Sequence, residues 1–228
     1  MAVSVNSDTY PYDRIQSGFT RLRGTEEIPI KILKYLMDLP LPGYTPIDDN
    51  DRARVRLMKY LWYDGARPLA NPLPTPTEKL SMLFDGDNPV LNTQEEKKRH
   101  PKGYRIYPQR VWGQSDTEAD TTLKLYLGRT IAKDNFHTVL GLQFEILVNV
   151  NMENTTRTDA YSRAYNIEQC IIEALHGVNI TGIGVINFNR YSHADDGSKS
   201  GFDYGNHVLR LPHMSVEWCD SEMDMPSD

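Results

Sequence analysis

The clearest pattern in the chain is an alternation of apolar and polar residues between positions 121 and 152. In TTLKLYLGRT the leucines fall on every second position, and in LQFEILVNVNM the alternation runs for eleven residues. Strict alternation predicts half-buried strands, and the short connection KDNFH predicts that they pair as an antiparallel hairpin. At about 3.4 Å per residue the second strand is roughly 37 Å long, beyond the usual five or six residues. We therefore expect part of this hairpin to extend past the core of its own subunit.

The residues expected at a subunit or partner interface come from this hairpin and the segment before it. The apolar face of the hairpin consists of Leu123, Leu125, Leu127, Phe144, Ile146, Val148, Val150 and Met152. Arg105 and Arg110 lie in the preceding segment YRIYPQRVW, within a cluster of basic and aromatic residues. Such a cluster can dock on an acidic surface of a partner, including the acidic end of another copy of this chain.

One helix and further strands complete the pattern of this region. A helix ending before Gly177 is expected to be capped by Thr158 or Asp159. Its buried stripe is formed by Ala160, Ala164, Ile167, Ile171, Ala174 and Leu175, and its outer face by Arg163, Glu168 and Glu173. Strands are expected at 104–112, 180–191 and 207–219, the last with an edge or a bulge at Pro212. Gly182 and Gly184 mark a kink or a close approach of another backbone.

The N-terminal part has a helical and proline-rich pattern. Residues 28–39 place apolar side chains on one helical face, and a second helix is expected after a cap among Asp48, Asp49 and Asn50. Four prolines between positions 68 and 76 predict a stiff, extended stretch. Thr75 and Glu78 then form a capping box that opens a short helix reaching about Phe84.

These patterns predict an α+β protein in three parts. Residues 1–103 form an arm of short helices and prolines, and the polar segment NTQEEKKRHPKG ends it. Residues 104–219 form an antiparallel sheet with a long β-hairpin and one packed amphipathic helix. Residues 220–228 form an acidic tail.

The charge distribution argues against general nucleic-acid binding. The net charge is −6, and five acidic residues with no Lys or Arg lie between Glu217 and Asp228. Removing those five charges leaves −1 for the rest of the chain, whereas a nucleic-acid binder is basic. The two cysteines, Cys170 and Cys219, lack metal-site spacing and indicate a reducing compartment. No secretory signal and no run of 18 apolar residues is visible, so we expect a soluble protein without membrane contact.

Motifs for catalysis are weak. Asp85 and Asp87, or the segment 193–196, could hold a divalent metal for a nuclease, but both look like Asx turns. There is no nucleophile elbow, and Gly182-Ile183-Gly184 lacks the rest of a dinucleotide fingerprint. The basic and aromatic cluster at 97–112 gives a second alternative, a nucleic-acid-binding module. The favoured expectation is a protein that is not an enzyme and has no cofactor or metal.

The layout of residues 121–219 resembles phage tail terminator and tail-completion proteins. The matching segments are TTLKLYLGRTIA, LQFEILVNVNM, DAYSRAYNIEQCIIEALHG, ITGIGVINF and HVLRLPHMSVEWC. The resemblance lies in the order and character of the segments and covers a little under half of the chain. The N-terminal 100 residues have no counterpart in a minimal terminator.

The resemblance implies a structural virion protein of a tailed bacteriophage, assembled in the host cytoplasm. Tail terminators form rings, usually hexamers, on the last ring of tube, and they join it to the neck. The implied partners are other copies of this chain, the tail tube protein and neck or connector proteins, with passive contact to DNA in the channel. The N-terminal departure leaves open an adaptor of another neck or connector layer.

Overall fold

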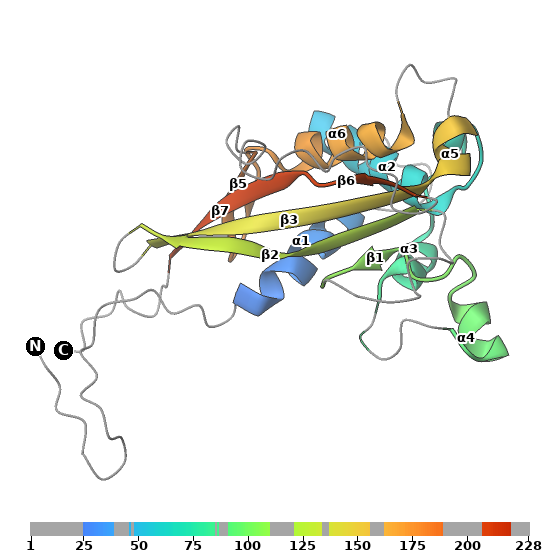
Figure 1. Ribbon diagram of the computed structural model, residues 1–228, viewed down its shortest axis with the longest axis horizontal. Helices are drawn as coiled ribbons and strands as arrows, with labels where there is room; N and C mark the ends of the chain where they lie inside the picture. The colour runs from blue at the N-terminus through green and yellow to red at the C-terminus, as the bar shows by residue number, and fades with distance from the viewer. Residues whose placement is uncertain are drawn as a thin grey trace, which may run out of the picture.

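A twisted antiparallel sheet runs through the centre of the molecule, and helices pack against it (Figure 1). The computed structural model describes residues 25–38, 46, 48–84, 86, 91–109, 121–133, 137–155, 162–188 and 207–219. Over these residues the protein has the α+β class expected from the sequence.

The sheet is ordered β1-β2-β3-β7-β5-β4 within the described residues, and β6 also pairs with β3. The strands are β1 Ile106–Tyr107, β2 Thr121–Ala132, β3 His137–Asn149, β4 Asn179–Ile180, β5 Gly184–Phe188, β6 His207–Arg210 and β7 His213–Cys219. All pairs are antiparallel except β1 with β2, where Ile106 lies opposite Leu123. The strand predicted at 104–112 is thus short, and Pro108, which has no backbone N–H to donate, follows its last residue.

The long hairpin of β2 and β3 is confirmed, but β3 begins and ends earlier than the predicted strand over residues 142–152. Strand β3 is thirteen residues long and begins at His137. It stops at Asn149, and helix α5 (Val150–Thr155) follows directly. The side chain of Asn149 accepts a hydrogen bond from the backbone N–H of Asn151 at 2.9 Å, an Asx turn that redirects the chain. The prediction that Val150 and Met152 continue the strand is therefore wrong.

The last two predicted strands are each divided. Residues 179–188 form a small hairpin whose turn contains Gly182, with a φ of 74°. Gly184 has a φ of 109°, and a Cβ there would lie 3.2 Å from the carbonyl oxygen of Glu217. The expected kink and close backbone approach are thus both present. Strands β6 and β7 both pair with β3 and are separated at Pro212, whose carbonyl accepts from the Phe144 N–H at 3.1 Å.

The N-terminal helices follow the predicted caps. They are α1 (Ile28–Met37), preceded by the 3-10 turn η1 (Thr25–Glu27), α2 (Asp49–Trp62), the 3-10 turn η2 (Pro68–Ala70) and α3 (Pro76–Met82). Asp48 caps α2, and Thr75 and Glu78 form the capping box of α3. Helix α4 (Gln94–Arg99) was not predicted, although Thr93 and Glu96 form a second capping box there.

Helix α6 (Arg163–Leu175) confirms the predicted stripe except for Ala160, which lies outside the described residues, as do Thr158 and Asp159. Ser162 provides the cap, and Gly177 follows the helix with a φ of 77°. The expectation that Arg163 and Glu168 face solvent is wrong, since both side chains are buried.

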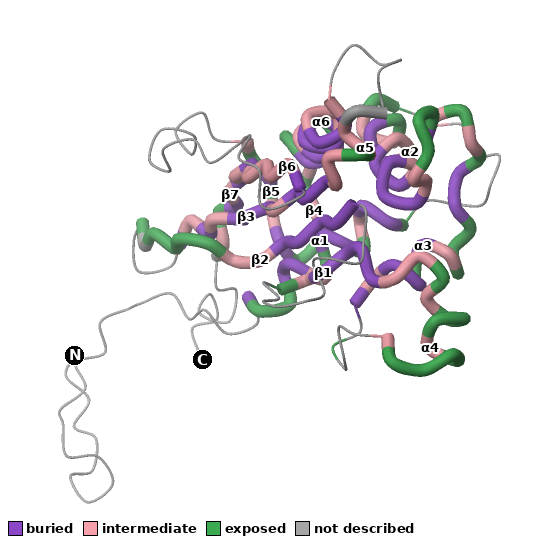
Figure 2. Tube along the Cα trace, turned by 45° about the vertical axis from the view of Figure 1, so that its right-hand side comes forward, coloured by how far each residue is buried: buried purple, intermediate pink, exposed green. Residues whose placement is uncertain are grey.

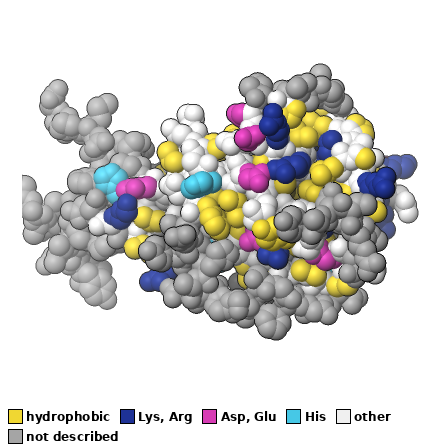
Figure 3. Space-filling model, turned by 90° about the horizontal axis from the view of Figure 1, so that it is seen from above, with side chains coloured by type: hydrophobic (Ala, Val, Ile, Leu, Met, Phe, Trp, Pro, Cys, Tyr) yellow, Lys and Arg dark blue, Asp and Glu magenta, His cyan; other side chains and the backbone are white. Residues whose placement is uncertain are grey.

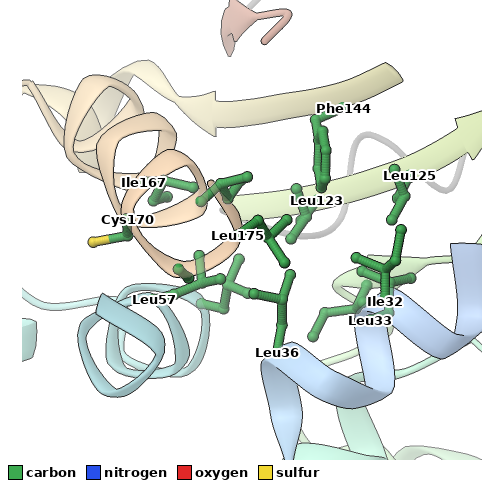
Figure 4. Packing of buried hydrophobic residues seen from close by; sticks show 14 of the residues in the cluster. Ile32, Leu33, Leu36, Leu57, Leu123, Leu125, Phe144, Ile167, Cys170 and Leu175 are labelled. Atoms are coloured by element: carbon green, nitrogen blue, oxygen red, sulfur yellow. The ribbon is translucent and has the colours of Figure 1, made fainter. Parts of the chain in front are cut away.

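One hydrophobic cluster joins the helices to the sheet. Side chains of α1, α2 and α6 converge on Leu123, Leu125 and Phe144 (Figure 4). Helix α6 therefore does not cover the sheet alone. The cluster draws on residues from both sides of position 103, so the N-terminal helices and the sheet share one core.

Candidate subunit interface

The apolar face of the hairpin lies inside the subunit. Leu123, Leu125, Phe144, Ile146 and Val148 are 0% exposed. In this fold they contact the chain's own helices and present no surface to a neighbour (Figure 4). The other three predicted interface residues, Leu127, Val150 and Met152, are partly exposed.

The opposite face of the hairpin near β1 is also buried. Lys124 is 1% exposed, and its ammonium group lies 3.1 Å from the carboxylate of Glu145 on β3. The Tyr126 hydroxyl lies 3.5 Å from the same carboxylate. Because both faces are buried there, this half of the hairpin belongs to the interior of the subunit.

The far half of the hairpin is exposed. Residues Gly128 to Ile131 of β2 are exposed, and Ile131 retains 50% of its surface (Figure 2). Lys133, at the outer end of β2, forms an exposed ion pair with Glu217 of β7 at 2.9 Å. We call residues 127–133 the hairpin tip.

The two edges of the sheet differ in how their backbone groups are satisfied. At the end of the sheet formed by β5 and β4, the segment after α6 covers the outer side of β5. The N–H of Gly177 donates to the carbonyl of Ile186, and the N–H of Ile186 donates to the carbonyl of Val178. The N–H of Phe188 donates to the ring of His176. At the other edge, β1 pairs only with Leu123 and Lys124 of β2. No described strand pairs with residues 127–132 on the side away from β3. An open strand edge can pair with a strand of another chain.

A bulge shapes the hairpin tip. The register between β2 and β3 shifts between Leu127 and Thr130. A Cβ at Gly141, across from the bulge, would lie only 2.7 Å from the carbonyl oxygen of Arg129. Glycine at this position lets the bulged strand approach closely, and bulges bend a strand and increase its twist.

Arg105, expected at an interface, is a buried structural residue. Its guanidinium binds both carboxylate oxygens of Asp64, at 2.6 and 3.0 Å, and the carbonyl of Leu61 at 2.7 Å. Burial alone would raise the pKa of Asp64, but hydrogen bonds and charges from Arg105 and Lys102 hold it below its usual value. Arg110 lies outside the described residues. Arg105 is thus not available to a partner.

Other buried cations also bind helix C-termini. Arg163 donates to the carbonyls of Tyr60 and Tyr63 at the end of α2. At the end of α1, Arg54 donates to Tyr35 and Asp38, and Lys79 donates to Met37 at 2.8 Å. Cations are favoured there because the last carbonyls of a helix lack intrahelical partners. Sequence reasoning missed these roles because Arg and Lys are normally exposed.

The outer surface of α2 and α6 carries paired charges. An open groove of about 670 Å³ is lined by Pro46, Asp49, Arg52, Val55, Arg56 and Glu173. Arg52 pairs with Asp49, and Arg56 pairs with Glu173. Figure 3 shows basic and acidic side chains next to one another on the upper face of the molecule. The groove therefore has no unbalanced charge with which to select an ion.

The residues considered for metal chemistry are not brought together by the described structure. Asp85, Asp87 and the segment 193–196 lie outside the described residues. In the part of the chain that is described, no three His, Cys, Asp or Glu side chains are grouped to hold a metal. Cys170 is a free, buried cysteine, and burial raises the pKa of its thiol to about 12, so it is not a nucleophile at neutral pH.

The length and hydropathy of the helices determine whether any of them could span a membrane. None of the helices within the described ranges has the length and apolar character needed to cross a bilayer.

The model of the family YomW matches the chain over residues 55–206. The chain belongs to the YomW family. This membership supports a phage-related protein, as the resemblance to tail terminators also implied, but it does not single out a tail terminator. No curated protein matches the chain, and no solved structure does.

The YomW match covers most of α2, the hairpin and α6, and it stops before β6. The hairpin tip lies within it. Strands β6 and β7, which pair with β3 from outside the matched region, complete the sheet. The hairpin tip is therefore the part of the YomW region that both projects from the core and leaves strand edge unpaired among the described strands.

Proposed function

We propose that this protein is a structural virion protein of a tailed phage that forms a ring at the head–tail junction. In this role the ring ends the tail tube and joins it to the neck. The observation that carries the proposal is the hairpin tip, an exposed length of β2 whose edge away from β3 pairs with no described strand. Membership of the YomW family supports the phage context.

The geometry of such an edge supports the proposed ring. When the tip of one subunit pairs with a different surface of the next, the contact is head-to-tail. Head-to-tail contacts close into a ring when the rotation between subunits allows it. The bulge and the charges of Arg129 and Lys133 limit indiscriminate pairing, so only a matched partner surface would be accepted.

The test measures assembly and its dependence on the tip. Light scattering after size-exclusion chromatography gives the copy number, and electron microscopy of the protein mixed with tail tubes shows whether rings sit on tube ends. Ile131→Glu should reduce assembly at least tenfold, because it places a charge on the exposed apolar residue of the tip. Val185→Glu is the matched control, since Val185 is 43% exposed but lies on β5, away from the tip.

The outcomes separate the proposed role from its alternative. Rings that bind tube ends support termination, whereas rings that bind connectors but not tubes support an adaptor of another neck layer. A protein that stays monomeric and associates with neither tubes nor connectors would overturn the proposal.

A further inference from the structure

Helix α4 presents exposed basic side chains that form no ion pair with the described residues. Lys97, Lys98 and Arg99 form its last turn, all three are exposed, and the helix has no buried residue (Figure 2). This contrasts with Arg54, Arg105 and the other cations that bind carbonyls inside the molecule. Because helix α4 has six residues and none of them is buried, packing against the core stabilises it little. Packing within the subunit therefore does not account for the basic residues on its surface.

An exposed leucine lies on the neighbouring helix. Leu80 of α3 is 61% exposed, the largest value among the big apolar side chains described. The next residue, Ser81, has its carbonyl 2.7 Å from the Nδ1 of His100, which follows α4 directly. We call Leu80, Lys97, Lys98 and Arg99 the α3–α4 patch. It combines an apolar side chain with three positive charges in the last turn of α4, whereas Glu95 and Glu96 lie in the first turn of the same helix.

The chain itself contains a segment of complementary chemistry. Residues 220–228, DSEMDMPSD, carry four acidic residues, no basic residue and two methionines. Acidic side chains fit the lysines and arginine, and Met is a flexible apolar side chain that adapts to an exposed leucine. This segment holds most of the unbalanced charge of a chain whose net charge is −6.

We infer that residues 220–228 of one copy bind the α3–α4 patch of a neighbouring copy. The inference rests on the proposed ring and adds a second contact between its subunits to the one made by the hairpin tip. The partner is a second copy of this chain, because residues 220–228 are too few to reach the α3–α4 patch of their own copy.

The reach of the segment excludes its own patch. Strand β7 ends at Cys219, which lies opposite His137 at one end of β3. Strand β1 lies near the other end of β3, because Ile106 is opposite Leu123 and Leu123 is opposite Ile146. The nine residue steps of β3 between these levels span roughly 31 Å at about 3.4 Å each. Nine residues fully extended after Cys219 span at most about 32 Å. Helix α4 lies beyond β1, at the opposite end of the molecule from the hairpin tip (Figure 1), so the acidic side chains fall short of it.

The experiment detects the contact by cross-linking in assemblies of the full chain. Equal amounts of ¹⁵N-labelled and unlabelled protein are mixed, allowed to exchange and treated with a carbodiimide, which joins lysine amines to carboxylates. Mass spectrometry should find Lys97 or Lys98 joined to Asp220, Glu222 or Asp224, with half of the linked peptides carrying one label from each copy. Links within single copies only, or no links to these lysines, would overturn the inference.

Charge reversal tests whether the contact contributes to association. Lys97→Glu, Lys98→Glu and Arg99→Glu together should weaken association at least tenfold, and Glu222→Lys with Asp224→Lys in a second copy should restore it. Lys31→Glu with Arg52→Glu is the control, since both residues pair with acids at the surface outside the patch. Circular dichroism checks that each variant is folded.

The remaining outcomes have fixed meanings. Rings that form unchanged with the reversed patch would overturn this inference and leave the proposed function standing. A protein that never assembles and never binds tubes or connectors would overturn both. A patch variant that loses affinity for DNA while its association is unchanged would show that the patch serves nucleic acid, which also overturns the inference.

Discussion

Arg105 and Arg163 bind the C-terminal end of α2 from two different elements, and Arg54 and Lys79 bind the end of α1 in the same way. Each contact joins segments far apart in the chain. A helix end buried in a core needs partners for its last carbonyls, and a long cationic side chain reaches them from a neighbouring element. At the residue scale Arg105 and Arg163 therefore connect the N-terminal helices to the sheet region, whereas Arg54 and Lys79 connect those helices to one another.

Loss of Arg105 should destabilise the protein strongly. Arg105→Ala leaves the partly buried Asp64 without its bidentate partner and the Leu61 carbonyl without a donor, which should lower the free energy of unfolding by about 3 kcal/mol. Urea unfolding followed by circular dichroism measures the change. Lys98→Ala, on the exposed face of α4, should change stability by no more than about 0.5 kcal/mol. Equal effects of the two substitutions would contradict the structural role of Arg105.

The pH dependence of stability follows from Asp64. Its folded pKa lies below its unfolded value of about 3.9, because Arg105 and Lys102 stabilise the carboxylate. The contribution is fully present above the unfolded pKa and is lost as the pH falls through the folded pKa. Stability measured from pH 6 down to pH 2 should therefore fall less steeply in Asp64→Asn than in the unaltered protein. Parallel curves would rule out this carboxylate as a source of the acid sensitivity.

At the element scale, the hairpin was the most predictable part and its ends were the least. Alternation shows which side chains of β2 and β3 share a face, so the pairing of Leu123 with Ile146 follows from the pattern. It does not show that Lys124, on the other face, is buried as well. The switch to α5 depends on one side chain, Asn149, that captures a backbone N–H, and alternation carries no information about it. The parallel pairing of β1 depends on contacts with distant residues, which a local pattern does not contain.

The way the elements pack also explains why most of the predicted interface residues of the hairpin are buried. The apolar face from Leu123 to Val148 was expected to meet a neighbour because the strand looked too long for its own core. The core is larger than expected because α1 and α2 add to it. The exposed length of the hairpin is instead the tip, whose residues alternate less clearly. The signal that could have located it is the pair of glycines, Gly128 and Gly141, that mark the bulge.

A pair of glycine substitutions tests the bulge. Gly141→Ala should lower stability by about 1–3 kcal/mol and alter the tip, because its Cβ would lie 2.7 Å from a backbone oxygen. Gly128→Ala should be neutral or stabilise by up to about 1 kcal/mol, since its nearest neighbours lie at 3.6 Å. Thermal unfolding gives the stabilities, and amide hydrogen exchange of residues 127–133 gives the local effect. If the two variants behave alike, the bulge does not depend on close approach at Gly141.

At the scale of the whole molecule, the N-terminal helices and the sheet share a core that crosses position 103. Ile32, Leu36 and Leu57 pack in the same cluster as Leu125 and Phe144 (Figure 4). A shared core means that neither part can lose its packing without exposing apolar surface of the other. The two should therefore unfold together.

Tryptophans in the two parts allow a direct measurement. Trp62 lies on α2 and Trp218 lies on β7, so variants retaining only one of them report on different sides of position 103. Urea unfolding should give the same midpoint by both fluorescence signals and by circular dichroism. Leu36→Ala on α1 should lower both midpoints, with a loss of about 3 kcal/mol. A shift at Trp62 without a shift at Trp218 would indicate two independent units.

The central position of β3 in the sheet affects the order in which the sheet can form during translation. One of its neighbours, β2, precedes it in the chain, whereas β6 begins 58 residues after β3 ends, counting from Asn149 to His207. During translation β3 therefore has one side occupied and the other side empty until β6 and β7 have been synthesised. Pairing over such a separation slows folding. Nascent chains thus finish their sheet late, and a chaperone that shields the open side of β3 would be expected to raise the yield of folded protein.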